Sequence, residues 1–436
     1  MDFEFGTADE AFRRQARAWL QERLTGEFAG AAGRGGPGSE HERGDVRRAW
    51  ERELGRGGWI GIGWDTGRSA DRGTGRDTGR SADQGAGRDT GRGVDRAAYG
   101  VRRATLTQQV VWAEEYARVR APGRCGHIGE NLLAPTLLAH GSKEQQDEFL
   151  PGIARGETLW CQGYSEPGAG SDLAGLRTTA VRDADGTYRV TGQKIWTSLA
   201  HEADWCFVLA RTEPGSRRHH GLSFLLLPMD QPGRIEVRPI RQLTGTSEFN
   251  EVFFDGAHAR AAHVVGGEGN GWRVAMGLLG FERGVSTLAQ QIGFTEELGR
   301  VVQEALGAGT AAADPVLRDR LVRQWAELRV MRWNALRTLG NGGGVAGAPS
   351  VAKLLWGGWH QRLGELAMAV RGSAAAVGPT DWSTDSPYEL DALQRLFLFS
   401  RADTIYGGSD EIQRNIIAER VLGLPREAKG PVRGTP

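Results

Sequence analysis

The apolar residues in the first third of the chain recur with a helical period. In segments 11–24, 106–116 and 128–138 they return about every third or fourth position. That spacing places them along one face of an amphipathic α-helix. The sequence therefore predicts a mainly α-helical domain over residues 1–158.

Short runs of apolar, β-branched and aromatic residues replace the helical period after Trp160. They are separated by turn residues and cover 188–191, 205–209, 222–226 and 252–254. Residues of these types favour strands, and the polar and glycine-rich breaks between them favour turns. We therefore expect a middle β domain over residues 159–270.

The helical period returns from Trp272 onward. Gly423 and Pro425 follow the last periodic segment, and both residue types commonly end helices. The sequence predicts a helical bundle over 271–424 and a loose tail over 425–436. The periodic segments are 272–301, 321–339, 354–370 and 412–422.

A low-complexity repeat interrupts the first helical region. The unit Asp-Thr-Gly-Arg-Ser-Ala-Asp begins at Asp65, restarts at Asp77 and restarts in part at Asp89. Because the repeat contains almost no residue that could bury apolar area, we expect 65–96 to be a surface insert without fixed structure. A calcium-binding Gly-Asp repeat is the alternative, but the interleaved arginines would repel a cation.

Composition and charge exclude several classes of function. A chain of 436 residues exceeds the usual size of a single core, so we expect several subdomains. With 54 basic and 54 acidic residues the formal net charge is zero, which argues against nucleic acid as a partner. No apolar run is long enough to span a membrane and no signal peptide opens the chain, so a cytoplasmic location is expected. Three widely spaced cysteines predict neither disulfides nor a metal site; they are Cys125, Cys161 and Cys206.

The segment with the most chemical information is Y-S-E-P-G-A-G-S-D at 164–172, where helix gives way to strand. A Pro-Gly turn with hydroxyls on both sides brings backbone N–H groups and short side chains close to a flat, polar-edged ligand. Alone, it could equally be a solvent-facing turn. Three further motifs follow it in sequence: G-Q-K-I-W-T-S at 192–198, F-N-E-V-F-F-D at 249–255 and I-Y-G-G-S-D-E-I-Q-R at 405–414.

In content and order these four motifs resemble the signatures of the acyl-CoA dehydrogenase family. The resemblance covers nearly the whole chain outside the 65–96 insert. It implies an N-terminal helical domain, a middle β-barrel-like domain and a C-terminal four-helix bundle. It also implies FAD as cofactor and α,β-dehydrogenation of an acyl thioester, presented by CoA or by an acyl-carrier protein. The β-hydride would pass to flavin N5 and the electrons to an electron-transfer flavoprotein.

The resemblance assigns cofactor contacts residue by residue. Trp196 matches the residue that packs on the flavin face; without its flanking motif, a core aromatic would be the default. Ser409 matches a contact to the FAD ribityl portion and could equally be the N-cap of the next helix. The assigned cofactor positions are Gln162, Tyr164, Ser165, Trp196, Ser198, Ser409 and Glu411.

Removing an α-proton requires a carboxylate in a dry pocket beside the flavin. Many family members carry that Glu directly after the Ile-Tyr of the last motif, but here the position is Gly407. A branch that resembles isovaleryl-CoA and long-chain dehydrogenases takes the base from an earlier helix, immediately before an Arg. Glu282 and Arg283 match that place, so Glu282 is the predicted base, with a structural ion pair as the alternative.

Two other assignments concern the thioester. Although Gly407 has no side chain to act as a base, the family resemblance implies a role for its backbone N–H, which helps polarise the thioester carbonyl. Ser171 matches a contact to the pantetheine arm, although it could simply cap a turn, and Arg283 is assigned to the substrate with it.

Two other functions remain open on this sequence. One is another flavin reaction on the same scaffold, such as that of an oxidase or an N-hydroxylating monooxygenase. The other is a non-catalytic subunit of a heteromer, suggested by the missing Glu at 407 and by departures from the family's intersubunit motifs at 296–300 and 371–375. A homodimer or homotetramer is otherwise expected. Bound flavin and bleaching by an acyl thioester would separate these functions.

Overall fold

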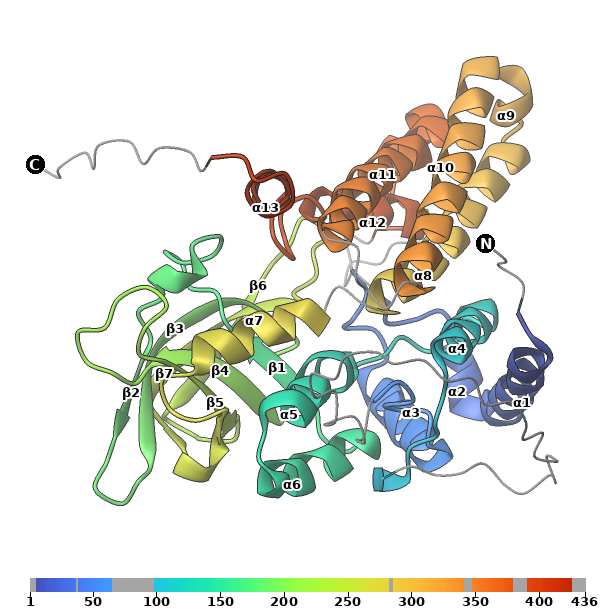
Figure 1. Ribbon diagram of the computed structural model, residues 1–436. Helices are drawn as coiled ribbons and strands as arrows, with labels where there is room; N and C mark the ends of the chain where they lie inside the picture. The colour runs from blue at the N-terminus through green and yellow to red at the C-terminus, as the bar shows by residue number, and fades with distance from the viewer. Residues whose placement is uncertain are drawn as a thin grey trace, which may run out of the picture.

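The computed structural model describes most of the chain (Figure 1). The predicted repeat at 65–96, the pair Glu282 and Arg283, and the last residues of the predicted tail lie outside the described part. For residues 98, 285–289, 339 and 340 only the backbone is described. The described residues are 5–36, 38–64, 98–281, 285–340, 347–378 and 390–425.

The N-terminal part is helical, as predicted. Its core holds several tryptophans, and the rings of Trp59 and Trp112 stack with centroids 4.1 Å apart. The predicted helices at 11–24 and 106–116 are confirmed, whereas 128–138 begins with a π-turn at Gly129–Leu133. The helices are α1 (Thr7–Arg23), α2 (Gly26–Gly30), α3 (Gly44–Gly57), α4 (Leu106–Arg118), α5 (Ala134–His140) and α6 (Lys143–Ala154).

Eight strands among the described residues form one sheet in the order β6-β7-β3-β2-β4-β5-β8, with β1 beside β4. Each run predicted as a strand from its residue types lies in one of them. The β1 and β4 strands run parallel, while β4 and β5 are antiparallel. The strands are β1 (Trp160–Gly163), β2 (Thr179–Arg182), β3 (Tyr188–Ser198), β4 (Trp205–Arg211), β5 (Leu222–Pro228), β6 (Ile235–Ile240), β7 (Phe249–Ala259) and β8 (Val264–Val265).

Strands β4 and β5 are apolar along nearly their whole length because both faces of this part of the sheet are covered. One face carries Phe207 and Phe224, which pack in a core with residues of α7 (Gly271–Phe281). The other face carries Val208 and Leu225, which pack with residues of β3 and β7. Figure 1 shows α7 lying across the sheet.

The C-terminal part is a helical domain in which α8, α10, α11 and α12 pack together. Trp359 is fully buried at its centre and donates from Nε1 to the Gln324 carbonyl at 3.0 Å. Helix α13 packs on α11 beside this bundle (Figure 1). Within the described ranges, no helix is both long enough and apolar enough to cross a bilayer. The helices are α8 (Val285–Gly307), α9 (Thr310–Ala313), α10 (Pro315–Gly340), α11 (Ala348–Arg371), α12 (Ala392–Phe399) and α13 (Asp410–Ile416).

Candidate functional site

A buried ion pair joins the turn after β1 to the middle of β3. Lys194 is fully buried, and its Nζ donates to Glu166 Oε1 at 2.9 Å and to the Tyr164 carbonyl at 3.0 Å. Glu166 also accepts from the N–H groups of Arg177 at 2.6 Å and Thr178 at 2.8 Å. The first two sequence motifs are therefore fixed to each other by one side chain from each.

Burial has opposite effects on the pKa values of Lys194 and Glu166. Burial lowers the pKa of Lys194, and the facing Glu166 only partly opposes it. Burial by itself would raise the pKa of Glu166, but Lys194 and the two N–H donors outweigh it and lower that pKa. A buried charge costs free energy unless it is paired, so each member of this pair needs the other.

Trp196 lies directly beyond this pair on a β-bulge. Between Lys194 and Thr197, strand β3 uses three steps where β7 uses two, so the pairing register shifts. Trp196 has a φ of 61°, which is strained for a bulky residue. A bulge re-aims a side chain, and the indole is 57% exposed while Thr197 beside it is fully buried. The alternative of a core aromatic is therefore wrong for Trp196.

Phe249 supports the exposed indole. The rings of Trp196 and Phe249 meet edge to face with centroids 6.3 Å apart. Phe249 is also the partner of Ser198 at the end of β3. The bulge thus exposes the flat indole of Trp196, and the hydroxyl-bearing Ser198 lies two positions further along the strand.

The residues assigned to β1 and the turn after it differ in how far their side chains are exposed. Gln162 is partly buried on β1, and Ser165 is partly buried after that strand. The ring of Tyr164 packs in the core, edge-on to Phe207 at 5.9 Å, so Tyr164 does not present its ring to a ligand at this turn. Ser171 is exposed.

The loop before α13 carries two glycines in the left-handed region, Gly407 with φ 65° and Gly408 with φ 87°. Gln413 Nε2 donates to the carbonyls of both glycines at 3.2 Å. Within the described part of the chain, neither glycine N–H has a hydrogen-bond acceptor. The loop is therefore held through its carbonyls, and its N–H groups can serve a ligand.

The remaining two assigned residues lie at the start of α13. Ser409 is its N-cap, because its Oγ accepts from the Ile412 N–H at 3.4 Å, so the structural alternative holds for this residue. Glu411 follows in the first turn with its side chain exposed. Capping does not exclude a ligand contact by Ser409.

Segment 38–42 touches all three parts of the chain. Arg395 of α12 donates to Ser39 Oγ and to Glu42 Oε1, both at 2.9 Å. His41 Nδ1 lies 3.3 Å from Glu248, which immediately precedes β7.

Burial is the largest cause that raises the pKa of Glu40, to about 8, and the negative charge of Glu248 is the second. A protonated carboxyl at this junction is therefore expected near neutral pH.

The raised pKa of Glu40 predicts a specific effect of pH on stability. Its pKa is higher in the folded chain than the ordinary value of 4.5, so its contribution is full below pH 4.5 and is lost as pH rises through 8. Glu40→Gln cannot ionise and should lose less stability over that range. We expect the melting temperature of the variant to gain on wild type by about 2–4 °C between pH 5.5 and 8.5. An identical pH dependence in both proteins, measured by differential scanning fluorimetry, would contradict this.

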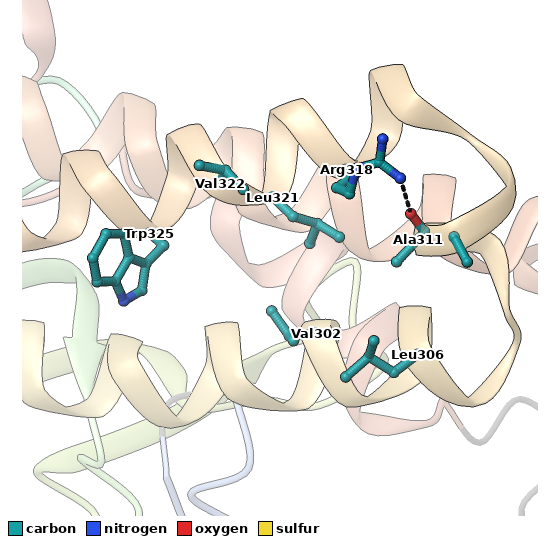
Figure 2. Close-up of a pocket in the computed structure, with 8 residues that line it drawn as sticks. Val302, Leu306, Ala311, Arg318, Leu321, Val322 and Trp325 are labelled. Atoms are coloured by element: carbon teal, nitrogen blue, oxygen red, sulfur yellow. Dashed lines mark hydrogen bonds between the residues drawn. The ribbon is translucent and has the colours of Figure 1, made fainter.

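A hollow of about 580 Å³ lies between α8, α9 and α10, as Figure 2 shows. Its walls are apolar, and Val302, Leu306 and Leu321 point into it. Its one charged residue, Arg318, donates to the Ala311 carbonyl at 3.3 Å. None of the motif residues lines it, and it offers no acid or base. The bulge at Trp196 and the glycine loop therefore stay the candidate site.

Glu166 and Lys194 lie within two of the sequence motifs, but the motifs predicted no role for either residue. The alternation along β3 contained the signal for Lys194, since Tyr188 and Val190 are buried and share its side of the strand. A lysine that continues a buried face needs an acidic partner. No comparable signal pointed to Glu40, whose surroundings come from three distant parts of the chain.

Models of one family match most of the chain in order. They are described as acyl-CoA dehydrogenase N-terminal domain, at residues 94–157, middle domain, at 161–257, and C-terminal domain, at 269–422. The chain is 53% identical to the acyl-CoA dehydrogenase IpdE1 of Mycobacterium tuberculosis, over 97% of this chain and 99% of that protein. It is 51% identical to the acyl-CoA dehydrogenase IpdE1 of Mycolicibacterium smegmatis, again over 97% of this chain and 99% of that one.

Solved structures agree with these sequence comparisons. A structure described as the Tcur3481-Tcur3483 steroid ACAD has a TM-score of 0.77 at 28% identity, covering 98% of this chain and 100% of its own. The ChsE4-ChsE5 complex from Mycobacterium tuberculosis has a TM-score of 0.74 at 29% identity, with the same coverage. The helix, sheet, helix architecture predicted from the sequence is thereby confirmed. The chain belongs to the acyl-CoA dehydrogenase family of oxidoreductases.

Proposed function

We propose that this chain carries out FAD-dependent α,β-dehydrogenation of an acyl thioester, with Glu282 as the base that removes the α-proton. The observation that carries the proposal is the backbone conformation of Gly407 and its lack of a side chain. It has no side chain where many family members have the base, and it has a φ of 65° and an N–H without an acceptor among the described residues. The position is built to donate a hydrogen bond, so the carboxylate must come from elsewhere.

FAD fits the residues that surround this position. The exposed indole of Trp196 offers a flat face for a flat ring, and its strained backbone would be retained only for a purpose. We propose that Trp196 and Ser198 hold the flavin ring together with Gln162, the main chain of Tyr164, and Ser165. We assign Ser409 and Glu411 to the ribityl and adenine portions. FAD, when bound, supplies the acceptor for the β-hydride.

We propose a separate role in the reaction of the thioester for each of the chain's own groups. The Gly407 N–H donates to the thioester carbonyl and so stabilises the negative charge that develops when the α-proton leaves. Glu282 takes that proton. Ser171 and Arg283 bind the substrate, Ser171 along the pantetheine arm. Exclusion of water by the acyl chain keeps the base effective.

Similarity to a protein described as a steroid ACAD suggests a class of acyl group. We propose that the acyl group is bulky and contains rings. Two of the similar structures carry paired protein names, so we also propose that a second, related subunit completes the assembly. An electron-transfer flavoprotein is the proposed electron acceptor.

Anaerobic mixing with acyl thioesters tests the proposal. The panel would contain straight-chain, branched and polycyclic acyl-CoAs and one acyl-carrier-protein thioester, and the readout is bleaching of the oxidised flavin spectrum. We expect the polycyclic acyl-CoA to bleach fastest. If no thioester bleaches a flavin-loaded protein, the proposed reaction is wrong; rapid oxygen consumption would then favour an oxidase. Purified chain that retains no flavin without a co-expressed partner would favour the non-catalytic subunit.

A further inference from the structure

A histidine in the C-terminal bundle lies between two carboxylates. His360 of α11 is buried, and its Nε2 lies 2.7 Å from Glu297 Oε2 of α8. Its Nδ1 lies 2.5 Å from Asp403 Oδ2, in the segment after α12. Burial alone would lower the pKa of His360, but the two carboxylates outweigh it and raise the pKa to about 10. Both ring nitrogens therefore carry protons and donate.

Asp403 is the centre of this network. It is fully buried, and besides His360 it accepts a hydrogen bond from the Tyr406 hydroxyl. Its main-chain carbonyl accepts from Lys353 Nζ, also on α11. One cation, His360, thus lies between two carboxylates, while Lys353 binds the main chain of Asp403. Burial raises the pKa of Tyr406 well above its usual value, with Asp403 adding to the effect. Tyr406 therefore stays neutral and keeps donating to Asp403.

The network ends next to the glycine loop. Tyr406 immediately precedes Gly407, and Thr404 is tied to the same helix because its Oγ1 accepts from Gln361 Nε2 at 3.0 Å. The Asp410 N–H donates to the Thr404 carbonyl at 3.1 Å and closes the loop at its base. Ile405 is 69% exposed, so apolar packing around that residue does little to hold the loop.

We propose that Glu297, His360, Asp403 and Tyr406 form a positioning device that holds the Gly407 N–H where the thioester carbonyl will lie. The assignment of that carbonyl rests on the proposed function. None of the four residues touches the substrate; they act through the loop. Replacing a buried ionic network by apolar residues is often neutral or stabilising, so stability alone does not explain why this bundle contains one. The network provides fixed geometry, on which a preorganised donor depends.

Two variants test the device in the flavin-loaded protein, with its partner if it needs one. Tyr406→Phe removes a single hydroxyl, and His360→Gln removes the positive charge and leaves both N–H donors on one nitrogen, so it cannot bridge the two carboxylates as the imidazolium does. We expect amide hydrogen exchange of segment 403–409 to become several-fold faster in both. The rate constant of bleaching by a saturating acyl-CoA should fall about tenfold, since small misplacements of catalytic groups have effects of that size or larger. The dissociation constant of the acyl-CoA should change less than about twofold, because only the orientation of one donor is lost.

Tyr188→Phe is the matched control. Tyr188 in β3 also donates to a carboxylate, Glu268 Oε2 at 2.8 Å, but far along the strand from the bulge. It should alter neither loop exchange nor bleaching. Wild-type exchange of segment 403–409 in folded Tyr406→Phe and His360→Gln would overturn the proposal, and so would wild-type bleaching rates. If wild-type protein itself is not bleached, the proposed function fails instead, and exchange still decides whether the network holds the loop.

Discussion

Glu282→Gln should retain bound FAD and lose bleaching by acyl-CoA, with a fall in the rate constant of about 10³–10⁴, at the upper end of what general acid–base groups contribute. The amide has nearly the size of the carboxylate but cannot accept the α-proton. Substrate binding should persist, because the Gly407 N–H and the contacts to the pantetheine arm remain. Stopped-flow absorbance of the oxidised flavin measures the rate, and a spectral titration measures substrate binding.

Glu327→Gln is the control for the loss of a negative charge in this part of the chain. Glu327 lies on α10, is exposed in a surface ion pair with Arg362, and is not one of the motif residues. Its variant should bleach within about twofold of wild type, since surface substitutions usually have small effects. Bleaching of Glu282→Gln at the wild-type rate would remove Glu282 from the mechanism.

Lys194→Met should lower the melting temperature by about 3–5 °C and weaken flavin retention. The change leaves Glu166 buried and charged without its cation, and breaking a buried pair in this way costs about 3–5 kcal/mol. The loss should reach the flavin site, because Lys194 also fixes the turn at Tyr164 and lies two residues before Trp196. Thermal unfolding and flavin absorbance after gel filtration are the measurements.

The double variant Glu166→Gln/Lys194→Met separates charge burial from other effects. With both changes no buried charge is left unpaired, and the amide oxygen still accepts one of the two N–H groups, those of Arg177 and Thr178, which bond to different oxygens of Glu166. We expect the double variant to recover part of the melting temperature that Lys194→Met loses, which is the signature of a coupled pair. If the cost of the double change equals the sum of the costs of the two single changes, Glu166→Gln and Lys194→Met, the pair contributes nothing specific.

The fold followed from the sequence where the pattern was strong. The helices at 106–116 and 354–370 and the strands at 205–209 and 222–226 lie where periodicity and residue type predicted them. Helix α3 and strand β6 were not predicted. Helix α3 buries Arg47 and Glu51, and β6 contains a proline, so both depart from the usual patterns. The domain limits near 158 and 270 stay predictions.

The site was predicted from four motifs as a set of residues without positions. In the structure Trp196 is exposed, Gly407 has a φ of 65°, and the ring of Tyr164 packs in the core; the roles assigned to these residues stay proposals. Glu282 and Arg283 lie outside the described residues, so their roles stay proposals. The charged groups beneath the site were missed because their partners are distant in sequence, as with His360, Glu297 and Asp403.

By itself the sequence determined the order of helix, sheet and helix, because hydrophobic period is a local property that each segment carries alone. It also determined the family, since four motifs in order are a property of the chain. Only the tertiary structure decided which charges are buried together, namely Lys194 with Glu166, and His360 between its two carboxylates. Electrostatic effects depend on distance and burial, which no linear spacing records.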